Sequence, residues 1–238
     1  YNITTTIIMI VTIAKVAASA AVVTLAGNCG RNMLQALGLR NSDNPPDLSN
    51  LQLPSTKDAE ETVQDLKSLN RLQLLQLFSL CEAPADVYEI EGEWEGTLLE
   101  NNGVIMTKIS DIMTNGFFAL GPGRKWDGKQ FENSGVIGIN RFFTGNENKR
   151  DTKIRCDVSI QESKLHPSKP SVQLIYFSHQ SPISPWKTMV DELRMVPGTK
   201  DVLLGMGSMG WSGGSMNSAP FCLRRLLDST QDATAEEL

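Results

Sequence analysis

From Gly92 to about residue 226, apolar positions alternate with polar ones along the chain. The clearest run spans residues 153–161, in which Ile154, Cys156, Val158 and Ile160 alternate with Lys153, Arg155, Asp157, Ser159 and Gln161. This period of two is typical of strands with one dry and one wet face. The same period recurs further on, in Val172, Leu174 and Tyr176, in Val202, Leu204 and Met206, and in Phe221, Leu223 and Arg225.

Turn-forming residues separate these runs: Asn101-Asn102-Gly103, Gly121-Pro122-Gly123, Gly145-Asn146, Pro197-Gly198 and Gly213-Gly214. About eight to ten short strands at this spacing indicate a sandwich or a closed barrel. Closure removes exposed strand edges, which favours the barrel. We therefore predict a mainly β fold, a closed antiparallel β-barrel over residues 90–226.

The N-terminal end has a different pattern. Residues 3–26 are dominated by Ile, Val and Ala, and such a run is long enough for a bilayer span, which needs about 20 residues. We predict a transmembrane anchor over residues 1–28. The stretch Ala18-Ser19-Ala20 resembles a signal-peptide cleavage site, so a signal-like helix is the alternative.

Lys15 lies near the middle of this apolar run. A lysine at that depth costs about 2.5–3.5 kcal/mol in lipid, which favours a helix face packed on protein. Ala14 and Ala18 form a small-x-x-x-small pair that permits close helix packing. Lys15, Ala14 and Ala18 are therefore candidate contacts to partner subunits. Arg31 and Arg40 follow the run, which places the barrel on the cytoplasmic or stromal side.

Between anchor and barrel we expect a linker over residues 29–56, where Pro45, Pro46 and Pro54 oppose regular structure. Residues 57–82 predict one amphipathic helix, capped by Ser55 or Thr56 and packed on the barrel. A partner-binding helix is the alternative. Residues 227–238 form a short acidic tail.

Charge and cysteine content narrow the function classes. The formal charge of −5 fits no basic nucleic-acid footprint, so we expect no nucleic-acid partner. The four cysteines form no C-x-x-C pair, and only two histidines are present; we expect no metal site and no intrinsic cofactor. The cysteines are interpreted as reduced, buried apolar side chains, with a disulfide between Cys156 and Cys222 as the alternative.

No pattern predicts catalysis. Residues 205–210 read G-x-G-x-x-G, but Gly213 and Gly214 follow instead of the helix that a dinucleotide site needs. We predict a long hairpin loop over residues 205–216 whose apolar side chains are candidate partner contacts: Met206, Met209, Trp211 and Met216. His179 beside Ser178 lacks an evident acid, and two carboxylate pairs are interpreted as surface charges, Glu93 with Glu95 and Asp191 with Glu192.

Gly92-Glu93-Trp94 opens the first strand, and Arg224-Arg225 ends the last. First and last strands are neighbours in a closed barrel, and strand parity puts Arg225 on the face of Phe221 and Leu223. A guanidinium over the Trp94 ring would close the barrel floor, a cation–π contact worth about 0.5–2 kcal/mol. This arrangement resembles the structural signature of lipocalins and calycins.

The run Gly92-Glu93-Trp94-Glu95-Gly96 also resembles the motif of the GXWXG family, and residues 126–131 resemble its W-x-G-K-x-F element. The resemblance covers residues 85–226 and implies a small barrel without a defined activity. The anchor, linker and residues 81–142 are also similar to plastid proteins of diatom-type algae. That resemblance implies a thylakoid location with the barrel on the stromal side, association with photosystem I, and chlorophyll or carotenoid contacts at the N-terminal helix.

Together these patterns predict a non-catalytic, membrane-anchored accessory subunit that stabilises or bridges a larger membrane complex, with membrane lipid and neighbouring subunits as partners. The alternative is a lipocalin-like carrier of a lipid, pigment or other hydrophobic ligand. Filling of the barrel by Trp94, Trp126, Ile154, Val158, Leu174 and Leu204 would favour the subunit, and a cavity would favour the carrier.

Overall fold

The computed structural model describes residues 27–38, 58–112, 114–115, 125–144 and 149–226. Its strands are β1 (Gly92–Leu98), β2 (Lys125–Glu132), β3 (Ile137–Thr144), β4 (Lys149–Glu162), β5 (Pro170–Ile175), β6 (Met189–Met195), β7 (Val202–Met209) and β8 (Ala219–Arg225). Its named helices are α2 (Ala59–Ser68), α3 (Arg71–Leu80) and α4 (Val104–Ile112), with short 3-10 turns η1 (Val87–Ile90), η3 (Phe177–His179), η4 (Pro185–Thr188), η5 (Gly210–Ser212) and η6 (Gly214–Asn217).

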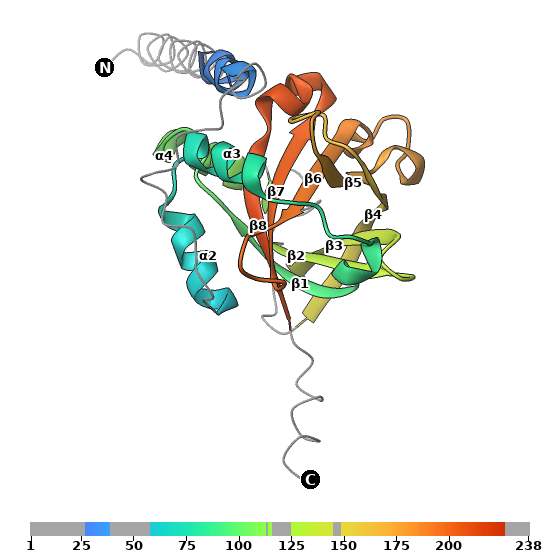
Figure 1. Ribbon diagram of the computed structural model, residues 1–238. Helices are drawn as coiled ribbons and strands as arrows, with labels where there is room; N and C mark the ends of the chain where they lie inside the picture. The colour runs from blue at the N-terminus through green and yellow to red at the C-terminus, as the bar shows by residue number, and fades with distance from the viewer. Residues whose placement is uncertain (1–26, 39–57, 113, 116–124, 145–148, 227–238) are drawn as a thin grey trace, which may run out of the picture.

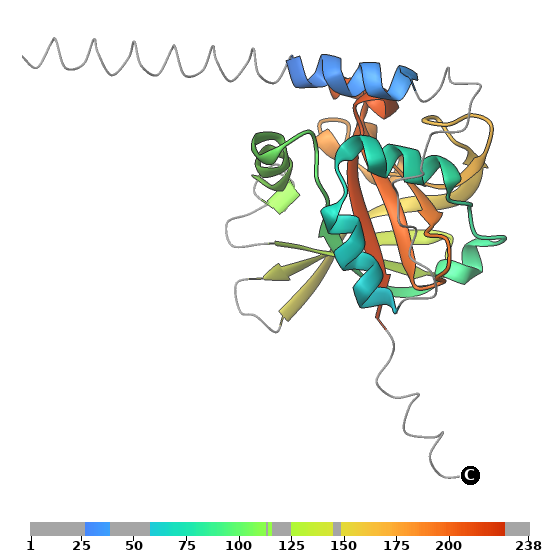
Figure 2. The same ribbon diagram turned by 60° about the vertical axis from the view of Figure 1, so that its left-hand side comes forward.

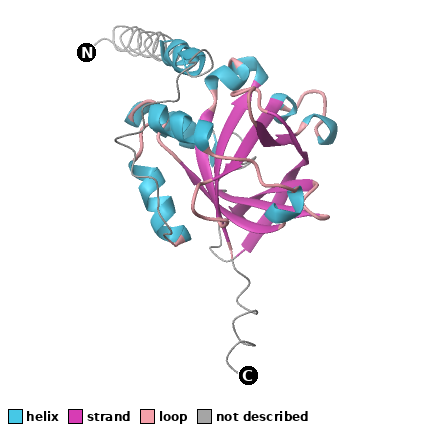
Figure 3. Ribbon diagram, viewed as in Figure 1, coloured by secondary structure: helices cyan, strands magenta, loops and turns pink. Residues whose placement is uncertain are grey.

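The eight strands close into a barrel in chain order, each antiparallel to its neighbours, and β1 pairs with β8. Figure 1 shows the barrel with α2 and α3 on its outer side, and Figure 3 shows how the strands surround one interior. This meander confirms the predicted mainly β, closed-barrel fold and has the up-and-down architecture of lipocalin-like barrels.

Two apolar cores lie on opposite faces of β7 and β8. The inner core lies inside the barrel and includes Trp94, Phe131, Leu193 and Leu223. The outer core lies between the barrel wall and the helices, and its members include Leu66, Leu74, Phe78, Val202, Leu204, Met206 and Cys222. The prediction that Leu204 fills the barrel is therefore wrong. Alternation could not identify the inner face there, because a strand buried on both faces is apolar at consecutive positions.

The predicted helix over residues 57–82 is two helices. Asp58 caps α2 by accepting a hydrogen bond from the Glu61 amide at 2.8 Å, so the helix begins later than expected. Asn70 then forms a capping box with Gln73 at the start of α3. In this capping box the Asn70 side chain accepts from the Gln73 amide, and the Gln73 side chain accepts from the Asn70 amide. These two hydrogen bonds favour the start of a new helix at Asn70 over one continuous helix.

The predicted linker over residues 29–56 is corrected only at its start, because residues 27–38 are helical; residues 39–56 lie outside the described ranges. Asn32 of this helix donates to Asn217 Oδ1 at 2.5 Å, and Gln35 Oε1 accepts from Arg71 Nη1 at 2.7 Å. Figure 2 shows the helix lying across one end of the barrel beside η5 and η6. Within the described ranges, no helix is both long and apolar enough to cross a bilayer. The predicted anchor lies almost wholly outside those ranges.

The barrel has two distinct ends. The β1–β2, β5–β6 and β7–β8 connections emerge from one end, which carries α4, η3, η4, η5 and η6; we call it the mouth end. The turn predicted at Asn101-Asn102-Gly103 leads there into α4 instead of directly into a strand. The opposite end carries η1 and the β2–β3 and β6–β7 turns.

Candidate functional site

Four polar side chains meet inside the barrel, each at a position that parity turns inward. Lys129 of β2 is the register partner of Asn140 on β3 and of Trp94 on β1. Asp191 of β6 is the partner of Leu174 on β5, and Tyr176 follows that strand. All four are at most 2% exposed. We call Lys129, Asn140, Tyr176 and Asp191 the polar cluster.

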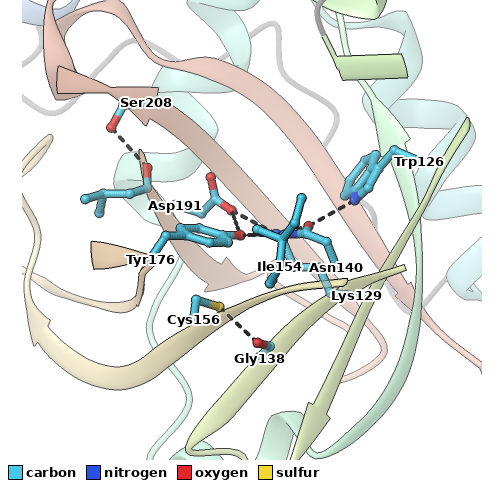
Figure 4. Close-up of polar contacts among 10 residues, drawn as sticks. Trp126, Lys129, Gly138, Asn140, Ile154, Cys156, Tyr176, Asp191 and Ser208 are labelled. Carbon is cyan, nitrogen blue, oxygen red and sulfur yellow. Dashed lines mark hydrogen bonds and ion pairs between the residues drawn. The ribbon is translucent and has the colours of Figure 1, made fainter. Parts of the chain in front are cut away.

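Lys129 is the centre of this cluster. Its ammonium nitrogen lies 2.8 Å from Asn140 Oδ1, 2.8 Å from the Tyr176 hydroxyl and 2.8 Å from Asp191 Oδ2 (Figure 4). Tyr176 donates to the same Asp191 oxygen at 2.9 Å, and Asn140 Nδ2 donates to the Tyr176 hydroxyl at 3.0 Å. The buried charges therefore neutralise each other within a shared hydrogen-bond network.

Aromatic rings surround the ammonium group. Its nitrogen lies 5.8 Å from the Trp126 ring, 5.5 Å from the Tyr176 ring and 5.7 Å from the Phe221 ring. The Trp126 indole also donates to Asn140 Oδ1 at 3.2 Å. Gly96 leaves room for the Trp126 ring, since a Cβ there would meet it at 2.5 Å. These cation–π contacts add stabilisation to a cation that has left water.

One acceptor of the cluster has no partner. Asp191 Oδ1 is buried and receives no hydrogen bond from the protein. Gly207 of β7 is the register partner of Asp191, and an added Cβ there would lie 3.0 Å from this oxygen. A buried carboxylate oxygen without a donor is costly. The cluster therefore has capacity for one more hydrogen-bond donor on the Gly207 side.

Burial keeps the neighbouring acids protonated. The pKa of Tyr176 lies well above its ordinary value because the phenol is fully buried and faces the Asp191 carboxylate. Burial also raises the pKa of Cys156, beneath the cluster, to about 12. Near neutral pH the phenol is a hydrogen-bond donor and the thiol is not a nucleophile. The arrangement is suited to holding a polar group.

The predicted floor contact is a separate feature at the opposite end. The guanidinium of Arg225 lies 4.3 Å from the Trp94 ring centroid, and Trp94 donates to the Ile90 carbonyl at 2.8 Å. Arg225 also donates to the carbonyls of Glu91, at 2.7 Å, and Glu89. These contacts tie β8 and η1 together across the start of β1.

The predicted partner residues of the 205–216 loop separate in space. Strand β7 continues to Met209, so the loop is shorter than predicted. Met206 is 1% exposed in the outer core, which excludes it from a surface contact and corrects the prediction. Met209 packs against the inner core and Met216 against the outer core, whereas Trp211 is 60% exposed. Lys15, Ala14 and Ala18 lie outside the described residues.

Sequence reasoning missed the polar cluster. Asp191 and Glu192 were predicted to be surface charges, yet both are buried, and Glu192 accepts from Ser171 Oγ at 2.8 Å. The period-two pattern of Met189, Asp191, Leu193 and Met195 does point Asp191 inward. The pattern for Lys129 was obscured by a β-bulge between Trp126 and Gly128, which shifts the register of β2.

His179 has an acid partner that the sequence did not reveal. Its Nε2 lies 2.7 Å from Asp157 Oδ1, and Ser178 donates to the same carboxylate. These two hydrogen bonds lower the pKa of Asp157. Ser178 and His179 each bond to Asp157, and both hydrogen bonds are exposed to solvent. We therefore interpret the three residues as a group of polar side chains on the surface. In the described part of the chain, no three His, Cys, Asp or Glu side chains are grouped to hold a metal.

The cysteines supply a direct test of the two cores. Cys156 lies in the inner core, Cys222 and Cys81 lie in the outer core, and all are free thiols. Burial raises the pKa of each of these three thiols to about 12, whereas Cys29 is only half-buried.

We expect a maleimide or disulfide reagent at about pH 8 to label Cys29 rapidly and the other three thiols only on unfolding. Cys29→Ser should abolish the rapid phase; a second rapid thiol would contradict the burial.

A hollow of about 620 Å³ lies outside the barrel at the end opposite the mouth. Its walls include Glu82, Pro84, Glu89, Pro197 and Lys200. The polar cluster contributes no residue to it, so it is a different feature from the interior site.

The sequence matches no protein-family model, and no curated protein is significantly similar to it. Among solved structures, a protein from Thermomonospora curvata is similar over 72% of this chain and all of its own, with 17% identity and a TM-score of 0.46. Bovine odorant binding protein, solved in complex with a selenium-containing odorant, is similar over 64% of this chain and 80% of its own, with 12% identity and a TM-score of 0.29.

Proposed function

We propose that the chain is a lipocalin-like carrier that holds an elongated apolar ligand with a hydroxyl group inside the barrel. The observation that carries this proposal is the buried Asp191 Oδ1 without a donor, in an otherwise apolar interior. A ligand hydroxyl donating to that oxygen would complete the polar cluster. The binding would follow the usual design of such sites, in which apolar walls supply affinity and a few polar groups orient the ligand.

The inner wall between the polar cluster and the mouth end favours entry of the ligand through the mouth end. Parity turns Gly207 of β7 and Ala219 of β8 inward there, and the two are register partners. Met189 and Met209, also register partners, pack at the border of the inner core. Gly207 and Ala219 present little or no side chain to this part of the interior, and methionine side chains adapt to different ligand shapes. Trp94, Trp126, Val158 and Leu174 pack in the inner core, as the accessory-subunit prediction expects, so the carrier proposal requires that the ligand lies on the mouth side of the polar cluster, beside this wall.

The test compares ligands that differ only in the polar end. A long-chain primary alcohol should bind at least about tenfold more tightly than the alkane of equal length, because a hydrogen bond to a charged acceptor is worth about 1.5–3 kcal/mol. Binding can be followed by the fluorescence of Trp126 and Trp186 or by calorimetry. Equal affinity for alcohol and alkane, or no binding of either, would refute the proposal.

Two variants separate ligand binding from folding. Gly207→Val places a side chain beside Asp191 Oδ1 and should weaken alcohol binding by more than about tenfold. Ser208→Val is the matched control, since its side chain points away from the interior and donates to the Val190 carbonyl. Unchanged alcohol binding by Gly207→Val would place the ligand elsewhere. Circular dichroism checks that both variants keep the barrel.

The accessory-subunit function, the photosystem I association and the pigment contacts stay predictions of the sequence. The residues expected to make the membrane contacts, Lys15, Ala14 and Ala18, lie outside the described residues.

A further inference from the structure

Large exposed apolar side chains gather at the mouth end of the barrel. Six of the nine such side chains among the described residues belong to it: Leu34, Leu37, Val104, Phe177, Ile183 and Trp211. We call these six the apolar rim. Ile183 is 94% exposed and Trp211 60%. Two of the other three, Tyr88 and Val136, lie at the opposite end. Figure 1 shows the mouth-end connections in the upper half of the view and η1 in the lower half.

The rim is built from segments far apart in the sequence. Val104 lies on α4, Phe177 and Ile183 on the β5–β6 connection, and Trp211 on η5. Leu34 and Leu37 lie on the helix over residues 27–38. That helix is bound to the mouth end through Asn32–Asn217 at 2.5 Å and Gln35–Asn102 at 3.3 Å. Exposed apolar side chains that converge at one end of a molecule mark an interaction surface.

Basic side chains accompany the rim. Lys187 lies 4.5 Å above the Phe177 ring, and three other basic side chains on the mouth-end segments are exposed: Arg31, Lys108 and Lys125. The described carboxylates of the connections and of the 27–38 helix are Glu100 and Asp111. Each accepts hydrogen bonds inside the chain, Glu100 from the Arg71 amide and Asp111 from Asn115.

The opposite end has no comparable basic excess. Its connecting segments carry Asp86, Glu89, Glu91 and Asp201 beside the exposed Lys200, and Asp201 pairs with Arg225 at 3.2 Å. An anionic surface would therefore attract the mouth end more strongly than the other end, which favours an orientation with the mouth toward that surface. An apolar rim with basic neighbours and an exposed tryptophan is the combination typical of proteins that rest in a bilayer interface.

The order of the N-terminal segments also points to the mouth end. The helix over residues 27–38 directly follows the apolar run of residues 3–26 in sequence, and it is bound to the mouth end by the contacts above. We propose that the mouth end rests on a lipid bilayer containing anionic lipid, with Trp211, Ile183 and Leu34 in the interface. This docking goes beyond the carrier function and does not require that the barrel holds a ligand.

The full chain reconstituted in vesicles of phosphatidylcholine and phosphatidylglycerol provides the test. Trp94, Trp126 and Trp186 are buried, at 0%, 8% and 3% exposure, so the fluorescence lost in Trp211→Phe reports on Trp211. Docking predicts that brominated lipid quenches this component and that aqueous iodide does not. Lys108→Gln combined with Lys187→Gln, or high salt, should reduce the quenching by brominated lipid.

The matched control puts the reporter at the opposite end. Tyr88→Trp in the Trp211→Phe background should be quenched by iodide and not by brominated lipid. Iodide quenching of Trp211 without brominated-lipid quenching would show that the barrel stands away from the bilayer and would overturn the proposal. Protection of Trp211 from both quenchers would indicate a protein partner or a second copy at the rim, which also overturns it.

Discussion

Lys129→Met is expected to lower the free energy of unfolding by about 3–5 kcal/mol, because it leaves the buried Asp191 carboxylate without its counter-charge. The ammonium group that this variant removes lies 2.8 Å from Asp191 Oδ2, and the two side chains are 2% and 0% exposed. Methionine keeps most of the apolar volume, so the loss is mainly electrostatic. Urea unfolding followed by circular dichroism measures the change.

Adding Asp191→Asn to Lys129→Met should recover at least half of the loss near neutral pH.

Lys125→Met is the matched control, because Lys125 is an exposed lysine on the same strand; a change within about 0.5 kcal/mol is expected. A loss below about 1 kcal/mol for Lys129→Met at neutral pH would contradict the buried pair.

Gly128→Ala is the second large effect, with an expected loss of about 3–5 kcal/mol from backbone strain and overpacking together. Gly128 follows the β-bulge of β2 and has a φ of +135°. A Cβ there would lie 2.0 Å from the Trp94 carbonyl oxygen and 2.7 Å from the Gly96 nitrogen. Both are backbone atoms of the neighbouring strand, so the β1–β2 pairing itself would have to move. Chemical denaturation measures this loss.

Gly214→Ala separates the two causes. Gly214 also has a positive φ, +60°, but no atom lies within 4 Å of the position of its Cβ. This variant should lose only the conformational part, about 1–2 kcal/mol. Equal losses for Gly128→Ala and Gly214→Ala would mean that the close strand contact contributes nothing.

Much of the barrel was predictable from the residues alone, because a strand with only one buried face shows alternating apolar and polar residues in its own sequence. Strand β4, with Ile154, Cys156 and Val158 on one side, shows the alternation directly, and the turn residues at Pro197-Gly198 separate β6 from β7. Parity was also enough to put Arg225 on the inner face with Phe221 and Leu223, next to Trp94.

The inner face of β7 was not predictable, because helices α2 and α3 bury the other face as well. A consecutive apolar run such as Val202-Leu203-Leu204 contains no alternation, and only the pairing of Leu203 with Leu223 shows which side is inside. The helix break at Asn70 was missed for a related reason. Apolar spacing continues across it, while the capping box that ends one helix and starts another is a matter of local hydrogen bonds.

The polar cluster could come only from the tertiary structure. Lys129, Asn140, Tyr176 and Asp191 lie on or beside four strands, and each is an ordinary polar residue in its own segment. A buried charge is tolerated only when its partner is present. Here the partner of Lys129 is Asp191, which lies 62 residues further along the sequence. Barrel closure brings the two together, and no local pattern in either strand contains that information.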